Sequence, residues 1–309
     1  MAKKTSSKSK AKKVSARKKA PAKRKRVSKT SPKRSRAPAK RTPKRAGRRA
    51  PSALKAAAAI SSFAPVVGQI AALAAASPIA DFDWKNRGVA PLGYIKGMAV
   101  TYGRVYCKFL ADDATAAEMA KADTHAPTLD ALSLYTPEFQ ALGWSNETTS
   151  ADTLRHLFVL LIGLGMRESS GQYCEGRDYS AENTEGETAE AGLFQVSFNA
   201  RSMSPLLPPL FATYQASPSG FVEIFKEGVT CKPKMLKNWG TGTGKEFQQL
   251  TKEAPAFAAE FAAVGLRNKL GHWGPIKRKE AQVIRDCDTM LRGVQDIVDS
   301  SAGACEALG

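Results

Sequence analysis

Between residues 150 and 178 the chain reads SADTLRHLFVLLIGLGMRESSGQYCEGRD, an apolar run that leads into a glutamate and a polar loop. Ser150 or Asp152 is placed to cap the N-terminus of a helix. Leucines recur along one face of this helix at intervals of three and four residues, at Leu154, Leu157, Leu161 and Leu164. Glu168 continues the same face one turn later. Because such an apolar stripe is buried, the pattern predicts a core helix that ends in a carboxylate.

Glu168 is predicted to be a weak acid that keeps its proton near neutral pH. Burial at the edge of the core removes water from the carboxylate, and the C-terminus of a helix adds partial negative charge. Both effects raise the pKa of Glu168, which is what a general acid needs in order to protonate a leaving oxygen. The alternative interpretation is structural: Glu168 caps the next turn or pairs with Arg167 or Arg177. Helix geometry alone leaves the two interpretations open.

A second segment, EAGLFQVSFNAR at residues 190–201, follows this glutamate. A helix that ends in RESSG, followed by AGLFQ, resembles the lysozyme-like superfamily, specifically the soluble lytic transglycosylase and goose-type lysozyme families. In those families a helix ends in a catalytic Glu followed by Ser, and a GLMQ segment lines the sugar-binding cleft. Here Glu168 and Ser169 match the first element, and residues 192–195 match the second with Phe in place of Met. The resemblance covers roughly residues 150–200.

This resemblance implies a mainly α fold, a lysozyme-like two-lobed helical domain with a central cleft. It also implies cleavage of β-1,4 bonds in peptidoglycan or a related amino-sugar polymer, with Glu168 as the catalytic residue and with no cofactor or metal. Ser169, Gln195 and Ser197 are expected to contact the substrate, the last two through hydrogen bonds to its amide and hydroxyl groups. Tyr173 and Trp273 are candidates to stack on a pyranose face of the substrate, but packing in the core is the preferred interpretation for both.

Hydrolysis of a glycoside normally needs a second carboxylate, whereas a lytic transglycosylase works with one glutamate that also deprotonates the sugar's own hydroxyl. The position two after Gln195 is Ser197, where goose-type enzymes carry an aspartate. The loop between the two motifs holds six acids. Glu190, directly before the cleft segment, is the first candidate for a second carboxylate and Glu187 the next, while a polar loop pinned by a disulfide at Cys174 is the alternative. Lytic cleavage is therefore preferred to hydrolysis.

The charge of the chain is divided unevenly. The formal charge is +19, but residues 1–50 hold 23 Lys or Arg and no acid, so the other 259 residues carry 24 basic and 28 acidic side chains. With little to bury, residues 1–52 are predicted to be a disordered polycationic tail. SPKR at Ser31 and TPKR at Thr42 resemble the tails of linker histones. Such a tail binds nucleic acid or another anionic surface without sequence specificity.

Domain boundaries follow from composition. Residues 53–80 are Ala-rich and are interpreted as a linker or peripheral helix, with the apolar core of a secretion signal as the alternative. Residues 81–309 are predicted to form the lysozyme-like catalytic domain. Apolar periodicity predicts helices in three further ranges, at 95–113, 128–144 and 278–298.

Two features that suggest other chemistry are set aside. GTGTGKE at residues 240–246 is not a phosphate loop, because Glu246 stands where Ser or Thr would bind magnesium, and it is predicted to be a flexible loop. The five cysteines form no CxxC pair and only three histidines are present, which argues against zinc. Two disulfides in an oxidising compartment, or buried free thiols, both remain open. No segment is predicted to span a membrane, and a periplasmic, secreted or virion-associated location is favoured.

Three other functions compete with the enzyme. The first is a catalytically inactive glycan- or polyanion-binding protein with a histone-like tail. The second is a glycosidase of the chitinase or chitosanase type. The third is a chromatin-type protein with an unrelated helical domain, which predicts that deletion of residues 1–52 removes all function.

Overall fold

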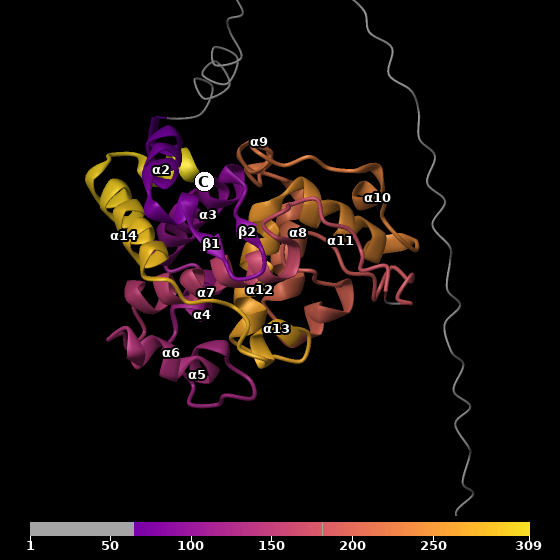
Figure 1. Ribbon diagram of the computed structural model, residues 1–309, viewed down its shortest axis with the longest axis horizontal. Coiled ribbons are helices and arrows are strands. Elements are labelled where there is room, and N and C mark those ends of the chain that lie inside the picture. Colours follow the sequence, from indigo (N-terminus) through magenta and orange to yellow (C-terminus); the bar gives the residue numbers. More distant parts are fainter. Residues whose placement is uncertain (1–64, 181) are drawn as a thin grey trace, which may run out of the picture. The chain divides into compact units, whose positions relative to one another are not determined.

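The computed structural model describes residues 65–180 and 182–309. The predicted tail (residues 1–52) and the first part of the Ala-rich segment therefore lie outside the described residues. The described part of the chain is mainly helical, as the sequence predicts (Figure 1). None of its helices is long and apolar enough to cross a bilayer.

The first half of the described chain contains the two longest helices and the only strands found in residues 65–180 and 182–309. In chain order its elements are α2 (Pro65–Ala76), the 3-10 helix η1 (Pro78–Asp81), β1 (Asp83–Trp84), β2 (Gly88–Val89), α3 (Leu92–Leu110), α4 (Ala114–Ala120), α5 (Ala131–Leu134), α6 (Thr136–Ala141) and α7 (Ala151–Ser169). The two strands pair antiparallel, with Asp83 opposite Val89 and Trp84 opposite Gly88. The predicted helices at 95–113 and 128–144 correspond to α3 and to the short pair α5 and α6.

The second half consists of shorter helices. They are η2 (Phe198–Met203), α8 (Leu207–Ala216), α9 (Val222–Phe225), α10 (Pro233–Leu236), α11 (Gly242–Glu253), α12 (Pro255–Leu266), α13 (Gly274–Lys277), α14 (Arg285–Ser300) and α15 (Ala304–Leu308). The predicted helix at 278–298 begins later, at Arg285, because residues 278–284 form a connection. The predicted flexible loop at 240–246 is wrong in its second half. Gly242 begins α11, and Gly244 packs on the backbone of Gly186, where a Cβ would lie 2.3 Å from the Gly186 carbonyl group.

Helix α7 forms the centre of the fold, where it packs against α3, α4, α12 and α14. Its N-terminus is capped as predicted, because the Ser150 hydroxyl accepts a hydrogen bond from the backbone N–H of Thr153. The predicted leucine stripe is buried, but burial extends around almost the whole helix. Even Arg155 is buried, with its charge held by Asp288 at 2.6 Å. A helix that is enclosed on all sides fixes the position of its last turn firmly.

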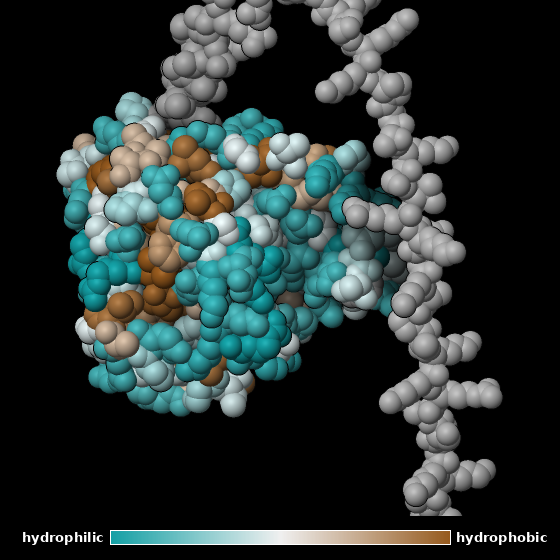
Figure 2. Space-filling view, in the orientation of Figure 1, coloured by the Kyte–Doolittle hydropathy of each residue, from teal (hydrophilic) through white to brown (hydrophobic). Residues whose placement is uncertain are grey.

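Helix α2 lies within the segment interpreted as a linker or peripheral helix. Pro65 does not interrupt it but begins it, and its apolar side chains pack on α3 and α14, with Ile70 fully buried. Figure 1 shows α2 beside α14. On the face of the molecule seen in Figure 2, apolar side chains gather on the side of α2 and α14, whereas the side of α8 and α11 is largely hydrophilic.

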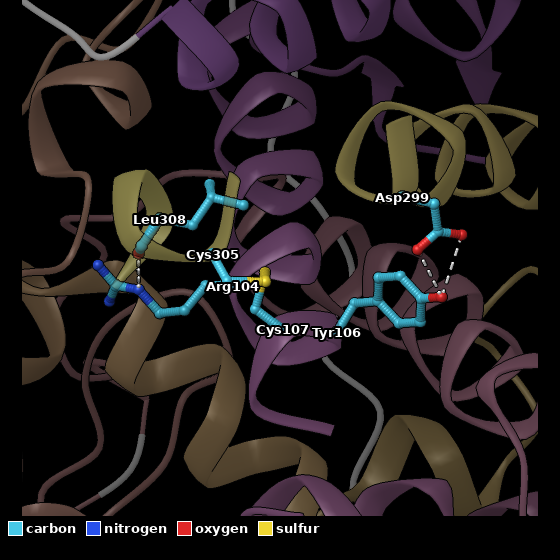
Figure 3. The surroundings of a disulfide bond; sticks show 6 residues. All are labelled: Arg104, Tyr106, Cys107, Asp299, Cys305 and Leu308. Atoms are coloured by element: carbon cyan, nitrogen blue, oxygen red, sulfur yellow. Dashed lines mark hydrogen bonds between the residues drawn. A yellow bond between two sulfur atoms is a disulfide. The ribbon is translucent and has the colours of Figure 1, made fainter. Parts of the chain in front are cut away.

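Two disulfides settle the open question about the cysteines. Cys107 of α3 is bonded to Cys305 of α15, and Cys174 is bonded to Cys231, while Cys287 is a buried free thiol. The first bond sits between two hydrogen bonds of the same helix α3 (Figure 3): Arg104 Nε donates to the carbonyl of Leu308 at 2.8 Å, and the Tyr106 hydroxyl donates to Asp299 at 3.1 Å. Together they fasten the C-terminal segment to the core helix.

Gly163 lets another part of the chain approach α7 closely. A Cβ at this position would lie 2.2 Å from the backbone oxygen of Gln282. This contact brings the connection before α14, including Arg278 and Glu280, beside the last turn of α7.

Gly163→Ala is expected to lower the free energy of unfolding by about 2–3 kcal/mol, because the contacted atom is backbone and must move. Urea denaturation of the two proteins measures the change. Gly68→Ala in α2 is the matched control: nothing lies within 4 Å of its new Cβ, and alanine raises helix propensity by up to about 1 kcal/mol. Equal losses of unfolding free energy in the Gly163→Ala and Gly68→Ala variants would show that the close contact between Gly163 and Gln282 is absent.

Candidate active site

A pocket of about 380 Å³ opens at the C-terminal end of α7. Four acids line it, namely Glu168, Glu175, Asp178 and Glu190, and three arginines face them, namely Arg87, Arg167 and Arg278. Gln195 lies in the same lining. Three residues that the sequence singled out, Glu168, Glu190 and Gln195, are therefore brought together in one pocket.

The chain reverses immediately after Glu168, and this reversal exposes its side chain to the pocket. Ser170 adopts a left-handed conformation with φ of 53°, and Gly171 follows with φ of 72°. The Gly171 N–H then donates to the carbonyl of Gly165 at 3.2 Å, which closes the end of the helix. A glycine suits the second of these positions because a left-handed backbone is disfavoured for other residues. Glu168 thus occupies the last full turn of a buried helix at the point where the chain leaves the core.

Glu168 is a weak acid in this environment. Burial raises its pKa to about 8, and the charge of Glu190 adds to the increase, while Arg278, Arg87 and Arg167 act in the opposite direction. The removal of water from the carboxylate thus outweighs three nearby cations. The predicted increase of the pKa is confirmed, and a proton on Glu168 near neutral pH is what general-acid chemistry needs.

Glu190 shares this behaviour. Burial, and next the charge of Asp178, raise its pKa above the ordinary range for glutamate. The charge of Glu190 in turn contributes to the raised pKa of Glu168. A pair of interacting carboxyl groups in one open pocket is a frequent arrangement at acid–base sites.

Gln195 reaches the pocket from a tight turn. A bridge joins Ala191 to Val196, and the Gly192 N–H donates to the carbonyl of Glu175 at 2.9 Å. Gln195 itself has a left-handed backbone, with φ of 45°, and its amide nitrogen donates to the Gly192 carbonyl at 3.0 Å. A non-glycine residue held in this region carries local strain, which is common at ligand sites. Its Oε1 and second amide N–H are groups that suit the N-acetyl substituent of a sugar.

The acid loop is fastened on both sides. The Cys174–Cys231 disulfide ties it six residues after Glu168, so the disulfide named in the alternative interpretation of this loop is present. Farther along, Gly186 contacts Gly244 of α11, as described above. These attachments hold Glu175, Asp178 and Glu190 in place opposite the end of α7.

Four predicted substrate-binding residues are outside the pocket lining. The Ser169 hydroxyl donates to the carbonyl of Gly165, and the Ser197 hydroxyl donates to the Asn199 side chain, so both serines serve local structure. Tyr173 is buried at 8% exposure. The stacking role proposed for Trp273 is wrong, because this side chain is fully buried and packs against Gly265 and Met203. The core alternative holds for both aromatic residues.

The alternative interpretation in which Glu168 pairs with Arg167 is not supported by the contacts of Arg167. The Nε of Arg167 donates to Glu280 at 2.9 Å, and no ion pair joins Arg167 to Glu168 among the residues that the structure describes. Glu187, the second choice for a further carboxylate, pairs with Arg201 at 2.7 Å and is not part of the pocket lining. Sequence reasoning missed Arg87 and Arg278 entirely, since no motif marks two arginines that lie far from Glu168 in the chain.

Glu168→Gln is expected to stabilise the protein in a pH-dependent way. Because the pKa is about 8 in the folded state and near 4.5 in the unfolded state, wild-type stability falls as the pH rises between these values and levels off above the upper one. Glutamine does not ionise. The stability advantage of the glutamine variant is therefore expected to grow by about 4 kcal/mol from pH 4.5 to pH 8.5, measured by urea denaturation at several pH values. The exposed Glu147→Gln control should show no such trend, and a flat difference for Glu168→Gln would contradict the raised pKa.

No family model, curated protein or solved structure matches this chain. A function for it therefore rests on the chemistry of the pocket and on the two sequence motifs that meet there.

Proposed function

We propose that the protein cleaves β-1,4 glycosidic bonds in peptidoglycan or a related amino-sugar polymer, with Glu168 as the catalytic acid and base. The observation that carries the proposal is a partly buried glutamate with a pKa of about 8 in an open pocket. Further support comes from Gln195, because the GLFQ motif brings it to the same pocket. On this proposal the helical domain is a two-lobed, lysozyme-like one in which the pocket is part of the cleft.

The proposed reaction begins with the proton on Glu168. It passes to the oxygen that links the two sugars while the bond between that oxygen and C1 breaks. The carboxylate of Glu168 then removes a proton from a hydroxyl of the same muramic acid residue, whose oxygen attacks C1 and closes an anhydro ring. Glu168 is thereby returned to its acid form, and one carboxyl group suffices.

Hydrolysis is the second candidate, and a specific observation favours it: Glu190 lies in the same pocket as Glu168. In that case Glu190 activates a water molecule that attacks C1, and the product carries a reducing end. For this role Glu190 has to be ionised, and its raised pKa restricts the reaction to the higher part of the working pH range. We therefore retain lytic cleavage as the first proposal.

Mass spectrometry of soluble fragments from purified peptidoglycan tests the proposal. The full chain should release anhydro-muropeptides, and the Glu168→Gln variant should release none. Reducing-end fragments that depend on Glu168 would identify a hydrolase with Glu190 as the candidate base. The absence of any Glu168-dependent product from peptidoglycan, chitin and chitosan would exclude the enzyme and leave a glycan- or polyanion-binding protein.

The proposed location is outside the cytoplasm, in the periplasm, in the medium or within a virion. Both disulfides support it, because such bonds persist mainly in oxidising compartments. We further propose that residues 1–52, which lie outside the described residues, attach the enzyme to anionic polymers or nucleic acid through their charge. Binding through this segment should weaken steeply as the salt concentration rises.

A further inference from the structure

One wall of the Glu168 pocket is made of arginines drawn from three separate parts of the chain. Arg87 comes from the turn between β1 and β2, Arg167 from the last turn of α7, and Arg278 from the end of α13. They are joined to one another: the Arg87 guanidinium donates to the backbone carbonyl of Arg167, and both Arg167 and Arg278 bind Glu280. We call these three residues the arginine wall.

The arginine wall carries more positive charge than its protein partner neutralises. Glu280 is the carboxylate that it shares, and the hydrogen bonds from Arg278 and then Arg167 hold the pKa of Glu280 at about 2, so this group stays ionised. One negative charge thus stands against three guanidinium groups. The opposite wall does not neutralise them through contact, since the described residues place no salt bridge between Glu168, Glu175, Asp178 or Glu190 and these arginines.

Most hydrogen-bond donors of the arginine wall remain available to a ligand. A guanidinium has five N–H groups. Within the described part of the chain, Arg87 and Arg167 each use one in the bonds named above, and Arg278 uses two, to the two oxygens of Glu280 at 2.8 and 3.0 Å. Arg87 and Arg278 are also exposed, and the Arg278 side chain is 60% accessible. Planar donors of this kind match a carboxylate, which they bind through paired hydrogen bonds.

The positive charge of the arginine wall is expected to favour some amino-sugar polymers over others, according to the charge that each polymer carries. Chitin is neutral and offers the arginines no countercharge. Chitosan carries free ammonium groups, which cannot accept hydrogen bonds from the guanidinium groups. A polymer with a carboxylate on the sugar next to the cleaved bond places that charge beside the acid, where the arginines can hold it.

We propose that Arg87, Arg167 and Arg278 bind a carboxylate substituent of the substrate, and that they select acidic amino-sugar polymers over chitin and chitosan. This inference rests on the proposed function, because it assigns a substrate class to the same pocket. The arginines are specificity-determining residues here, and the proton transfers remain with Glu168.

Binding measurements on two glycans of equal length test the inference. The first is chitohexaose, which is neutral. The second is a hexasaccharide of alternating N-acetylglucosamine and N-acetylmuramic acid from which the peptides have been removed, so that each muramic acid bears a free lactyl carboxylate. Calorimetry with the full chain uses the Glu168→Gln background throughout, which prevents turnover and removes any effect of the arginines on the ionisation of Glu168.

The double substitution Arg87→Gln with Arg278→Gln is expected to weaken binding of the acidic hexasaccharide by about 10- to 100-fold, the range for charge-assisted hydrogen bonds. Binding of chitohexaose should change less than about twofold. Since both residues are exposed, the variant is expected to fold, and circular dichroism checks this. As a control, Arg285→Gln together with Arg292→Gln removes the same amount of positive charge from α14, away from the pocket. This variant shows how much of any loss of affinity comes from weaker overall attraction between the acidic glycan and the positively charged protein.

Two results would overturn the inference. One is an equal loss of affinity for both glycans, and the other is an unchanged preference for the acidic glycan. The proposed function is judged separately, by Glu168-dependent cleavage of whole peptidoglycan with the arginines intact. If the enzyme cleaves peptidoglycan and chitin equally well, with or without Arg87 and Arg278, the proposed function stands. The proposed selection by the arginine wall is then wrong.

Discussion

Replacing Glu168 with glutamine is expected to lower kcat for the proposed glycan cleavage by about three orders of magnitude, because the substitution removes the proposed proton donor. Affinity for the glycan should change little, since an amide occupies nearly the same volume as a carboxyl group. Reducing-end and anhydro-end assays on purified peptidoglycan measure the rate, and calorimetry measures binding. Glu147→Gln, an exposed substitution outside the pocket, is the control and should retain full activity.

The pH profile of the wild-type enzyme is part of the same expectation. In the proposed reaction Glu168 can act as an acid only while it carries its proton, so kcat should fall as the pH rises through about 8. An ordinary glutamate would give this loss near pH 4.5. A rate that keeps increasing above pH 9, or a Glu168→Gln variant with wild-type activity, would contradict the role of Glu168.

Removing the Cys107–Cys305 disulfide is expected to cause the largest loss of stability. The bond closes a loop with a sequence separation of 198 residues, and the entropy of so long a loop in the unfolded chain corresponds to about 3–5 kcal/mol. Cys107→Ser with Cys305→Ser should lower the free energy of unfolding by this amount. Urea denaturation without reductant measures it.

The second disulfide provides the matched comparison. Cys174–Cys231 closes a shorter loop, with a separation of 57 residues, so its loss should cost about 1 kcal/mol less. Its effect on activity should be the larger of the two, because it holds the loop that carries Glu175, Asp178 and Glu190. An unchanged stability in the Cys107→Ser, Cys305→Ser protein would mean that this bond does not form.

Local pattern predicted the elements on which the site depends. The spacing of leucines and the Ser150 cap identified α7, and position on that helix identified a partly buried, weakly acidic Glu168. The order of two motifs placed Gln195 near this residue. These predictions succeeded because they concern residues on a single helix, or in segments that follow one another closely.

Contacts between distant segments were beyond the reach of the same reasoning. Arg87 and Arg278 reach the pocket from segments far from Glu168 in the chain. Gly163 allows residues near Gln282 to pack on α7, and nothing in the neighbouring sequence records that approach. The predicted stacking of Trp273 on a sugar ring was wrong for a related reason. Its sequence context is compatible with either a cleft or a core, and the core position follows from its packing on Gly265 of α12.

In the folded protein, Glu168 is expected to carry a proton at neutral pH. Glutamate-selective ¹³C labelling and a pH titration of the carboxyl resonance test it directly, with the Glu168→Gln variant identifying the signal by its absence. A midpoint near pH 8, well above the ordinary value of 4.5, is the predicted result. A midpoint near 4.5 would contradict the account, because the pocket would then hold an ionised glutamate with no proton to give.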